Sequence, residues 1–365
     1  MSPGLTGLAV ALLSLMTASA LADALLEDFH VLQKPKGDHG YRGIMGDFAQ
    51  LEDGSILLSY TDGDLMVLRS VDGGRTWSEP SVLMPRPAPP ARGTVCHPSF
   101  LRLPDGNLML TYIYTTHPVT PYFATNYYRL SADEGETWTE PYCYTPYPGY
   151  VQVHNDRLAT LSTGRIIATA EGKGYLPSTE DHSGYVGLTF FSDDGGFSWQ
   201  SSKNTVDLFG EQRIEVQEAD VVELKDGRLL MFARTYSGHP VFAYSEDKGE
   251  TWGPGALRTD IAMPYAGLPT VRRIPSTGDL LFIWIDEHAQ DPVNPQIHRR
   301  CALATAISRD EGETLTNVRH IARDPLDDFG YQCVEFLADG AVLVGYHARD
   351  GIHVARIGVE WFYGQ

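Results

Sequence analysis

The chain has few basic residues and few cysteines. Lys and Arg total 28 against 47 Asp and Glu, which gives a formal net charge of −19 and an isoelectric point near 4.9. Nucleic acids and anionic membrane surfaces are bound by basic patches, so this composition argues against both as partners. The four cysteines show neither a CxxC pair nor metal-ligand spacing with histidine: they are Cys96, Cys143, Cys301 and Cys333. We therefore expect no metal and no cofactor, and the sequence leaves open whether two of these thiols form a disulfide.

Linkers and apolar runs of membrane-spanning length are also missing. Residues 5–16 are mostly apolar and precede small residues at Ala18, Ala20 and Ala22, which is the layout of a secretory signal. This run is shorter than the roughly 20 residues that span a bilayer. We therefore predict a signal peptide over residues 1–22, a secreted or periplasmic location and no membrane insertion. Residues 23–365 contain no Pro/Ser-rich linker or charge block, which predicts a single domain.

Two short motifs recur along the chain. An Asp-box motif occurs five times, as SVDGGRTW from Ser70, SADEGETW from Ser131, SDDGGFSW from Ser192, SEDKGETW from Ser245 and SRDEGETL from Ser308. A turn followed by a strand occurs six times, beginning at Asp53, Asp105, Thr163, Asp226, Thr277 and Asp339. The Asp-Gly or Thr-Gly pair of each turn is typical of a hairpin, because Gly supplies the positive φ that the turn requires. Repetition of this kind indicates an array of one supersecondary unit.

Each unit reads as four strands without an amphipathic helix between them. Radial repetition of such units protects sheet edges, so we predict an all-β fold, a six-bladed propeller of four-stranded antiparallel blades. No box follows the last unit, at Ile352 to Phe362, which predicts that strand material from the N-terminal end closes the ring. Within each box, Asp and Thr oxygens satisfy turn amides and Trp fills the gap between sheets. Five copies of an Asp cannot share one active site, so the boxes are structural.

Aligning the repeats locates a candidate site. The first strand of each blade lines the axis, and its end opens on a face where pockets gather. Eight positions before each turn lie Met45, His97, Asn155, Glu218, Pro269 and Tyr331. Eight positions after it lie Thr61, Ile113, Glu171, Arg234, Ile285 and His347. Equal offsets on the two sides of a hairpin bring the ends together, so Glu218 and Arg234 should meet at one mouth of the bore.

These residues and motifs resemble those of the sialidase (neuraminidase) superfamily of glycoside hydrolases. The family segment EXXVVELXDG, with an arginine at the end of the next strand, matches Glu218 and Arg234. The form RXXLXXXIS matches RCALATAIS and identifies Arg300, and GYXXXXXLXDG matches GYQCVEFLADG and identifies Tyr331. The resemblance covers essentially all of residues 23–365 and implies the same propeller fold.

The resemblance also implies a chemistry. Sialic acids carry a carboxylate on the anomeric carbon, which a guanidinium can bind through paired hydrogen bonds. A neutral tyrosine avoids the repulsion that a carboxylate nucleophile would meet there, and sialidases depart from the two-carboxylate pattern in this way. Tyr331 is then the nucleophile and Glu218 its base. The expected protein is a secreted retaining exo-α-sialidase acting on sialylated or other anionic glycans.

The first blade departs from the family pattern. The family has an (F/Y)RIP motif there, whereas this chain has YRGIM, so Arg42 is the candidate for the first arginine of the site. The family's general acid is an aspartate on a loop that is short here, and Asp62 is the first candidate, with Asp64 and Asp47 behind it. The glutamate that usually supports the first arginine is replaced by His347.

Two further polar positions on the inner strands are not part of the family motifs. His97 and Asn155 are candidates for contacts with sugar hydroxyls, and Asp156 and Arg157 for an ion pair in the bore. His97 is also an alternative general acid, because the histidine pKa ordinarily lies near working pH. Two other functions therefore stay open: a glycosidase or lyase acting on a different acidic glycan with a different acid, and a glycan-binding propeller without catalysis.

Overall fold

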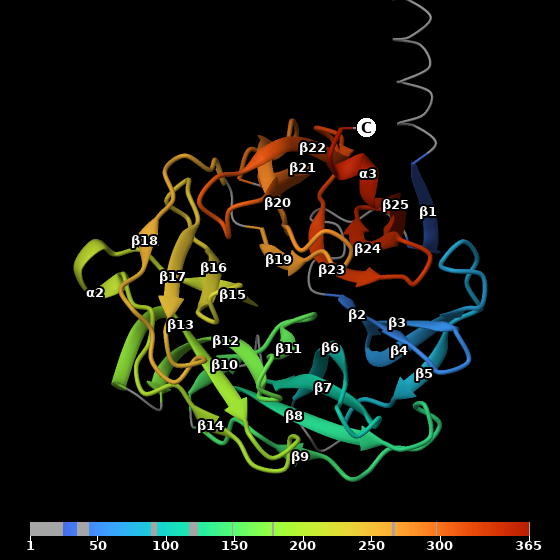
Figure 1. Cartoon of the computed structure of the whole chain (residues 1–365), viewed down its shortest axis with the longest axis horizontal. Coiled ribbons are helices and arrows are strands. Elements are labelled where there is room, and N and C mark those ends of the chain that lie inside the picture. The colour runs from blue at the N-terminus through green and yellow to red at the C-terminus, as the bar shows by residue number, and fades with distance from the viewer. Residues whose placement is uncertain are drawn as a thin grey trace, which may run out of the picture.

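The blades of the protein are arranged in a ring (Figure 1). A computed structural model describes residues 25–34, 44–88, 93–116, 123–147, 149–176, 179–264, 267–296 and 298–364. The predicted signal peptide and Arg42 lie outside the described residues. Within them, strands dominate, and the helices α2 (Phe209–Gln212) and α3 (Val359–Phe362) are single turns. None of the described helices has the length and apolar character needed to cross a membrane.

The described strands form six blades in chain order and pair antiparallel within each blade, and a single parallel pair, Tyr150↔Ala124, joins the second and third blades into one sheet. The first three blades contain β2 (Met45–Gln50), β3 (Ile56–Asp62), β4 (Asp64–Ser70) and β5 (Ser81–Met84); β6 (Thr94–Arg102), β7 (Leu108–Thr115), β8 (Ala124–Ser131) and β9 (Tyr142–Cys143); and β10 (Tyr150–Gln152), β11 (Leu158–Thr160), β12 (Ile166–Leu176), β13 (Thr179–Ser192) and β14 (Gln200–Ser201). The third blade has a divided inner strand, because β10 and β11 both pair with β12.

The last three blades follow the same plan. They contain β15 (Gln217–Glu223), β16 (Leu229–Arg234), β17 (Val241–Ser245) and β18 (Ala256–Leu257); β19 (Thr270–Arg273), β20 (Leu280–Gln290), β21 (His298–Ser308) and β22 (Thr316–Arg323); and β23 (Gly330–Phe336), β24 (Ala341–Ala348), β25 (Gly351–Gly358) and β1 (Leu26–Gln33). The N-terminal strand β1 thus completes the sixth blade, pairing antiparallel with β25 from Leu26↔Ile357 to Gln33↔Gly351. Figure 1 shows blue β1 beside red β25. The predicted fold and its mode of closure are both confirmed.

The five Asp boxes make the same hydrogen bonds, as the repeated sequence predicts. In the first box the Ser70 hydroxyl donates to Asp72, and the Asp72 carboxylate accepts the Thr76 amide and hydroxyl at 2.8 and 2.6 Å. The equivalent bonds recur in the other four boxes. In the third box, bonds from the Ser198 hydroxyl and amide lower the pKa of Asp194 to about 2. These carboxylates hold exposed turns and are not catalytic groups.

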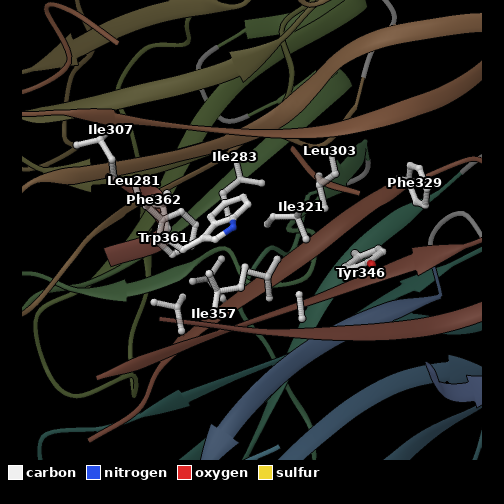
Figure 2. Close-up of a cluster of buried hydrophobic side chains, with 14 of the residues drawn as sticks. Leu281, Ile283, Leu303, Ile307, Ile321, Phe329, Tyr346, Ile357, Trp361 and Phe362 are labelled. Atoms are coloured by element: carbon white, nitrogen blue, oxygen red, sulfur yellow. The ribbon is translucent and has the colours of Figure 1, made fainter. Parts of the chain in front are cut away.

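The hydrophobic core is divided into six layers, each between two successive blades. The layer between the fifth and sixth blades combines Ile283 of β20 and Leu303 of β21 with Ile357 of β25, and Trp361 and Phe362 of α3 cover its end (Figure 2). Burying apolar side chains between blades contributes about 25 cal/mol per Å². Each blade is therefore stabilised by its neighbours on both sides. Strand β1 completes the sixth blade, which packs against the first blade and so closes the ring.

A buried polar network joins the inner strands around the axis. Asp47 of the first blade accepts hydrogen bonds from the Ser99 hydroxyl and the Phe100 amide of the second, at 2.8 and 3.0 Å. Asp156 forms an ion pair with Arg272 of the fifth blade and accepts the Val334 amide of the sixth at 3.0 Å.

Arg157 belongs to the same network, but the predicted ion pair with the Asp156 carboxylate is wrong. Arg157 donates to the Asp156 backbone carbonyl at 2.8 Å, and its carboxylate partner is Asp220 at 3.8 Å. Arg272 of the fifth blade forms ion pairs with both Asp156 and Asp220, so it is the partner of Asp156 that Arg157 was expected to be.

Candidate active site

Bulges in the inner strands direct the candidate catalytic side chains. The β6 ladder passes from Cys96↔Ile113 to Ser99↔Thr111, so two residues of β6 face one of β7. The same irregularity occurs in β15 and β23. In each case the first extra residue has a left-handed backbone, with φ of 52° at His97, 46° at Glu218 and 51° at Tyr331. Such bulges re-aim side chains and are frequent beside active sites.

The same bulge corrects the alignment of the first and third blades. In β2 the ladder skips between Met45 and Phe48, so Gly46 is the equivalent of His97, one position after the residue that counting had indicated. In the third blade the left-handed residue is Asp156, which follows Asn155. Counting eight residues back from each turn therefore finds the bulge residue in the second, fourth and sixth blades. In the first and third blades the same count stops one residue before it.

Tyr331 and Glu218 meet in a cavity of about 690 Å³, which also exposes atoms of Arg234, His97, His154 and Glu171. The Tyr331 hydroxyl donates to Glu218 Oε1 at 2.9 Å. The other oxygen, Oε2, forms an ion pair with Arg234. The expected convergence of nucleophile, base and arginine is thus present in this geometry.

The charges around Glu218 keep it ionised. Burial has the largest single effect and opposes ionisation, but the charges of Arg234, His154 and Arg300 and the Tyr331 hydrogen bond together outweigh it and lower the pKa of Glu218 to about 2. Burial and the Glu218 charge raise the pKa of Tyr331 to about 12. At neutral pH the pair therefore consists of a neutral phenol hydrogen-bonded to a carboxylate, which is the arrangement that a general base requires.

Arg234 is held in a fixed orientation. Its Nε and Nη2 atoms donate to Gln217 Oε1 at 3.0 and 2.6 Å, and Nη2 also reaches the Tyr236 hydroxyl at 3.1 Å. Gln217 precedes Glu218 on β15, and Tyr236 follows β16, so this one blade supplies the arginine and its supports. No motif in the sequence marks Gln217 or Tyr236 as a site residue.

Arg300 of β21 lies beside Tyr331. Its guanidinium carbon is 5.3 Å from the centre of the Tyr331 ring. Arg300 is buried, and its Nε and Nη1 atoms have no hydrogen-bond partner among the described residues. Buried guanidinium groups ordinarily have their hydrogen bonds satisfied, and a carboxylate is the partner that fits the fork best. The side chain is therefore available to an anion beside Tyr331.

His97 and His154 form a second group of polar side chains in the cavity. Their ring centres are 4.7 Å apart, and the His97 ring is 5.6 Å from that of Tyr331. His154 Nε2 lies 3.4 Å from Glu171 Oε1, and Glu171 Oε2 accepts the Glu218 amide at 2.8 Å. Burial, with the nearby His154, lowers the pKa of His97 to about 3. His97 is therefore neutral near pH 7, which contradicts the expectation that its pKa lies near working pH.

His154 and Glu171 were not predicted as site residues from the sequence. Glu171 is a repeat position that occupies the place in the third blade that Arg234 occupies in the fourth. That equivalence with Arg234 could have marked Glu171 as a site residue. No such signal marked His154, because it lies in the irregular segment between β10 and β11, where counting from the turn fails.

Asn155 differs from its expected role. Its amide nitrogen donates to the backbone carbonyls of Gly46 and Tyr331 at 3.1 and 3.0 Å, and it is not among the residues that line the cavity. Asn155 therefore joins three blades and supports the bulge that carries Tyr331. His347 is buried opposite Gly330, with its ring 5.7 Å from that of Tyr331.

The first-blade carboxylates are also placed differently from the expectation. Asp62 is at the exposed end of β3 and pairs with Lys34, and Asp64 contacts Arg86. Asp47 belongs to the axial network. Among the described residues that line the cavity there is no carboxylate from the first blade. A short hairpin, with Asp62 paired to Asp64 across a tight turn, explains why Asp62 remains at the edge.

Similarity to known proteins agrees with this fold. Residues 61–344 match the family described as BNR repeat-like domain. The chain is 24% identical over 350 residues to a sialidase of Micromonospora viridifaciens; the match covers 86% of this chain and spans only 50% of that protein's length. A stretch of 144 residues, 38% of this chain, is 31% identical to the anhydrosialidase of Macrobdella decora, over 18% of that protein.

Solved structures show the same fold. The intramolecular trans-sialidase of Ruminococcus gnavus has a TM-score of 0.67 at 14% identity, covering 91% of this chain and 98% of that one. The NanB sialidase of Streptococcus pneumoniae has a TM-score of 0.66 at 13% identity, covering 91% and 71%. A protein of unknown function from Dyadobacter fermentans is as similar, with a TM-score of 0.65 at 19% identity over 91% and 99%. The chain therefore belongs to the BNR repeat-like domain family and has a sialidase-like propeller fold.

Proposed function

We propose that this protein is a retaining exo-α-sialidase that removes terminal sialic acid, or a related 2-ulosonic acid, from glycans. The observation that carries the proposal is the hydrogen bond of 2.9 Å from the Tyr331 hydroxyl to Glu218, inside a cavity that Arg234 lines, with Arg300 beside the Tyr331 ring. Binding alone does not need a nucleophile paired with a base. The secretory signal expected at residues 1–22 places the activity outside the cytoplasm, as a further part of this proposal.

In the proposed reaction the two arginines hold the substrate carboxylate next to Tyr331. The free Nη1 of Arg300 and the second N–H of Arg234 Nη1 supply the hydrogen bonds, because Arg234 Nη2 is already occupied by Gln217 and Tyr236. Tyr331 attacks the anomeric carbon while its phenolic proton passes to Glu218, and the bond to the leaving oxygen breaks, with that oxygen taking its proton from a solvent water and leaving hydroxide. A second water then attacks the anomeric carbon and gives its proton to that hydroxide, while Glu218 returns its proton to the departing Tyr331 oxygen, with net retention of configuration.

Turnover of a fluorogenic α-sialoside tests the proposal. We expect Tyr331→Phe to lower kcat by about 10³-fold or more, because the variant keeps the ring but loses the nucleophilic oxygen. Tyr244→Phe is a matched control on β17 of the blade that carries Glu218, outside the cavity, and should keep wild-type rates. A wild-type rate that survives in Tyr331→Phe would exclude Tyr331 as the nucleophile.

One observation favours a second candidate, a glycan-binding propeller without catalysis. The described residues that line the cavity include no first-blade carboxylate to protonate the leaving group. The same preparation separates the two functions, because saturable binding of a sialoside with no product, by calorimetry and product chromatography, supports binding alone. Release of sialic acid or of its 2,7-anhydro form supports catalysis, and the product identifies whether water or a substrate hydroxyl completes the reaction.

A further inference from the structure

Histidines from the first and last strands meet where the ring closes. His30 of β1 and His353 of β25 are direct partners in the antiparallel ladder, and their rings stack with centres 4.5 Å apart. Asp350 lies in the turn that precedes β25 and reaches the same place. This group lies on the sixth blade's outer hairpin and is not part of the cavity described above.

The ligand atoms of these three residues are close enough to share one metal ion. His353 Nε2 is 3.1 Å from Asp350 Oδ1, and His30 Nε2 is 4.0 Å from the same oxygen. All three ligand atoms lie within 4.8 Å of one another. Ligands bound at about 2.0–2.2 Å to a tetrahedral zinc ion are about 3.3–3.6 Å apart. The Asp350 distances lie on either side of this range, and the His30 side chain, 31% exposed, has room to turn inward.

A second carboxylate orients one of the two rings. Asp28 Oδ2 lies 3.2 Å from His353 Nδ1, and the Tyr346 hydroxyl donates to the other Asp28 oxygen at 2.9 Å. A carboxylate on one imidazole nitrogen fixes the proton there and directs the lone pair of the other nitrogen outward, as in zinc sites. Asp28 thus prepares His353 Nε2 to bind a cation. His30 Nε2 now contacts the Asp350 carbonyl at 3.2 Å and would exchange that contact for the metal.

We propose that His30, Asp350 and His353 bind a divalent transition metal ion of the zinc type, which fastens strand β1 onto strand β25. Two imidazoles and one carboxylate are ligands that zinc prefers, and water completes the coordination. Because the ligands come from both ends of the chain, a bound ion links the first strand to the last. The net charge of −19 favours cation binding as well.

A second group of possible ligands is less suitable. Asp286, Glu287 and His320 also lie close together on the fifth blade. However, Glu287 is engaged by Arg323 at 2.8 Å, and both carboxylate oxygens of Asp286 contact His320, at 3.1 and 2.9 Å. This group has one imidazole instead of two. It therefore provides a matched control.

Zinc titration of tag-free protein, freed of metal with EDTA, tests the site. We expect ZnCl2 to bind by calorimetry at one ion per chain and to raise the melting temperature. His30→Ala should weaken binding at least tenfold and abolish the rise, and Asp28→Asn should weaken binding about 10–100-fold, as loss of an outer carboxylate does. His320→Ala should bind as wild type. Circular dichroism checks that each variant is folded.

A cobalt titration provides a second readout. Two imidazoles and a carboxylate around Co²⁺ give visible absorption bands that His30→Ala and His353→Ala should lose and His320→Ala should keep. The proposal is overturned if wild-type protein binds no zinc, if binding survives in both His30→Ala and His353→Ala, or if His320→Ala removes it.

Discussion

At the scale of single residues, backbone conformation determines the site. His97, Glu218 and Tyr331 all have a positive φ that residues other than glycine rarely adopt. Such conformations cost on the order of 1–3 kcal/mol each and persist where the surrounding structure imposes them. Here the inner-strand bulges impose them, and Asn155 and Glu171 bond to the backbone of Tyr331 and Glu218. The strained backbone at these three positions directs the three side chains into the same cavity.

The charge of Glu218 predicts a pH-dependent contribution to stability. Its pKa is about 2 in the folded protein, below the ordinary 4.5, so ionisation favours folding. This stabilisation is full above pH 4.5 and is lost as pH falls through 2, with a total on the order of 3 kcal/mol. We expect Glu218→Gln to lower the urea midpoint at pH 7, and the difference from wild type to shrink towards pH 2. A difference that stays constant between pH 7 and 3 would contradict this assignment.

At the scale of elements, the Asp box is a turn that fixes blade packing. Its hydrogen bonds repeat in all five copies, but the box tryptophans are not equivalent. Trp252 is buried between the third and fourth blades, and its indole donates to Thr189 at 3.0 Å. Trp77 is half-buried at the edge of its layer. The same motif therefore contributes differently at different blades.

Truncating these two tryptophans measures that difference. Trp252→Ala should lower the free energy of unfolding by about 3–5 kcal/mol, because it leaves a cavity and removes the hydrogen bond that the Thr189 hydroxyl accepts. Trp77→Ala, at the same position of its own box, should cost clearly less. Denaturant unfolding of both variants gives the comparison, and equal losses would show that the burial difference does not control stability.

At the scale of the whole molecule, the ring depends on contacts between distant parts of the chain. β1 covers β25, and the layer between the sixth and first blades brings Tyr331 and Cys333 against Met45. Tyr331 therefore depends on closure for its position. The four cysteines are free thiols and contribute no covalent link to this closure.

Removal of β1 should open the ring. A chain that begins at residue 34 leaves the β25 edge unpaired, and exposed edges promote aggregation. We expect a lower melting temperature and concentration-dependent aggregation by light scattering. A chain that begins at residue 23 keeps β1 and should behave as the full chain does. Equal melting temperatures for the two truncations would show that closure by β1 is not stabilising.

Much of the fold and part of the site were predictable from the sequence. The repeats predicted six blades because each is a local signal, a Gly turn or an Asp turn between strands. Glu218 and Tyr331 lie on bulges at the same distance from their turns, so counting from the turn gives correct positions, and the motifs identify Arg234 and Arg300. Counting failed at Met45, because β2 has one residue fewer between bulge and turn than β6, and at Asn155, because the inner strand of the third blade is divided.

The sequence alone therefore determined the repeat, the strand order and the residue types that reach the axis, since these depend on local turns and on alternation along strands. The tertiary structure decided which of those residues meet. It brought His154 and Glu171 into the cavity, kept Asp62 outside it, and turned Asn155 to the backbone. It also set His30 against His353 across the closure of the ring. Contacts between residues hundreds of positions apart depend on blade packing and ring closure, which no local pattern encodes.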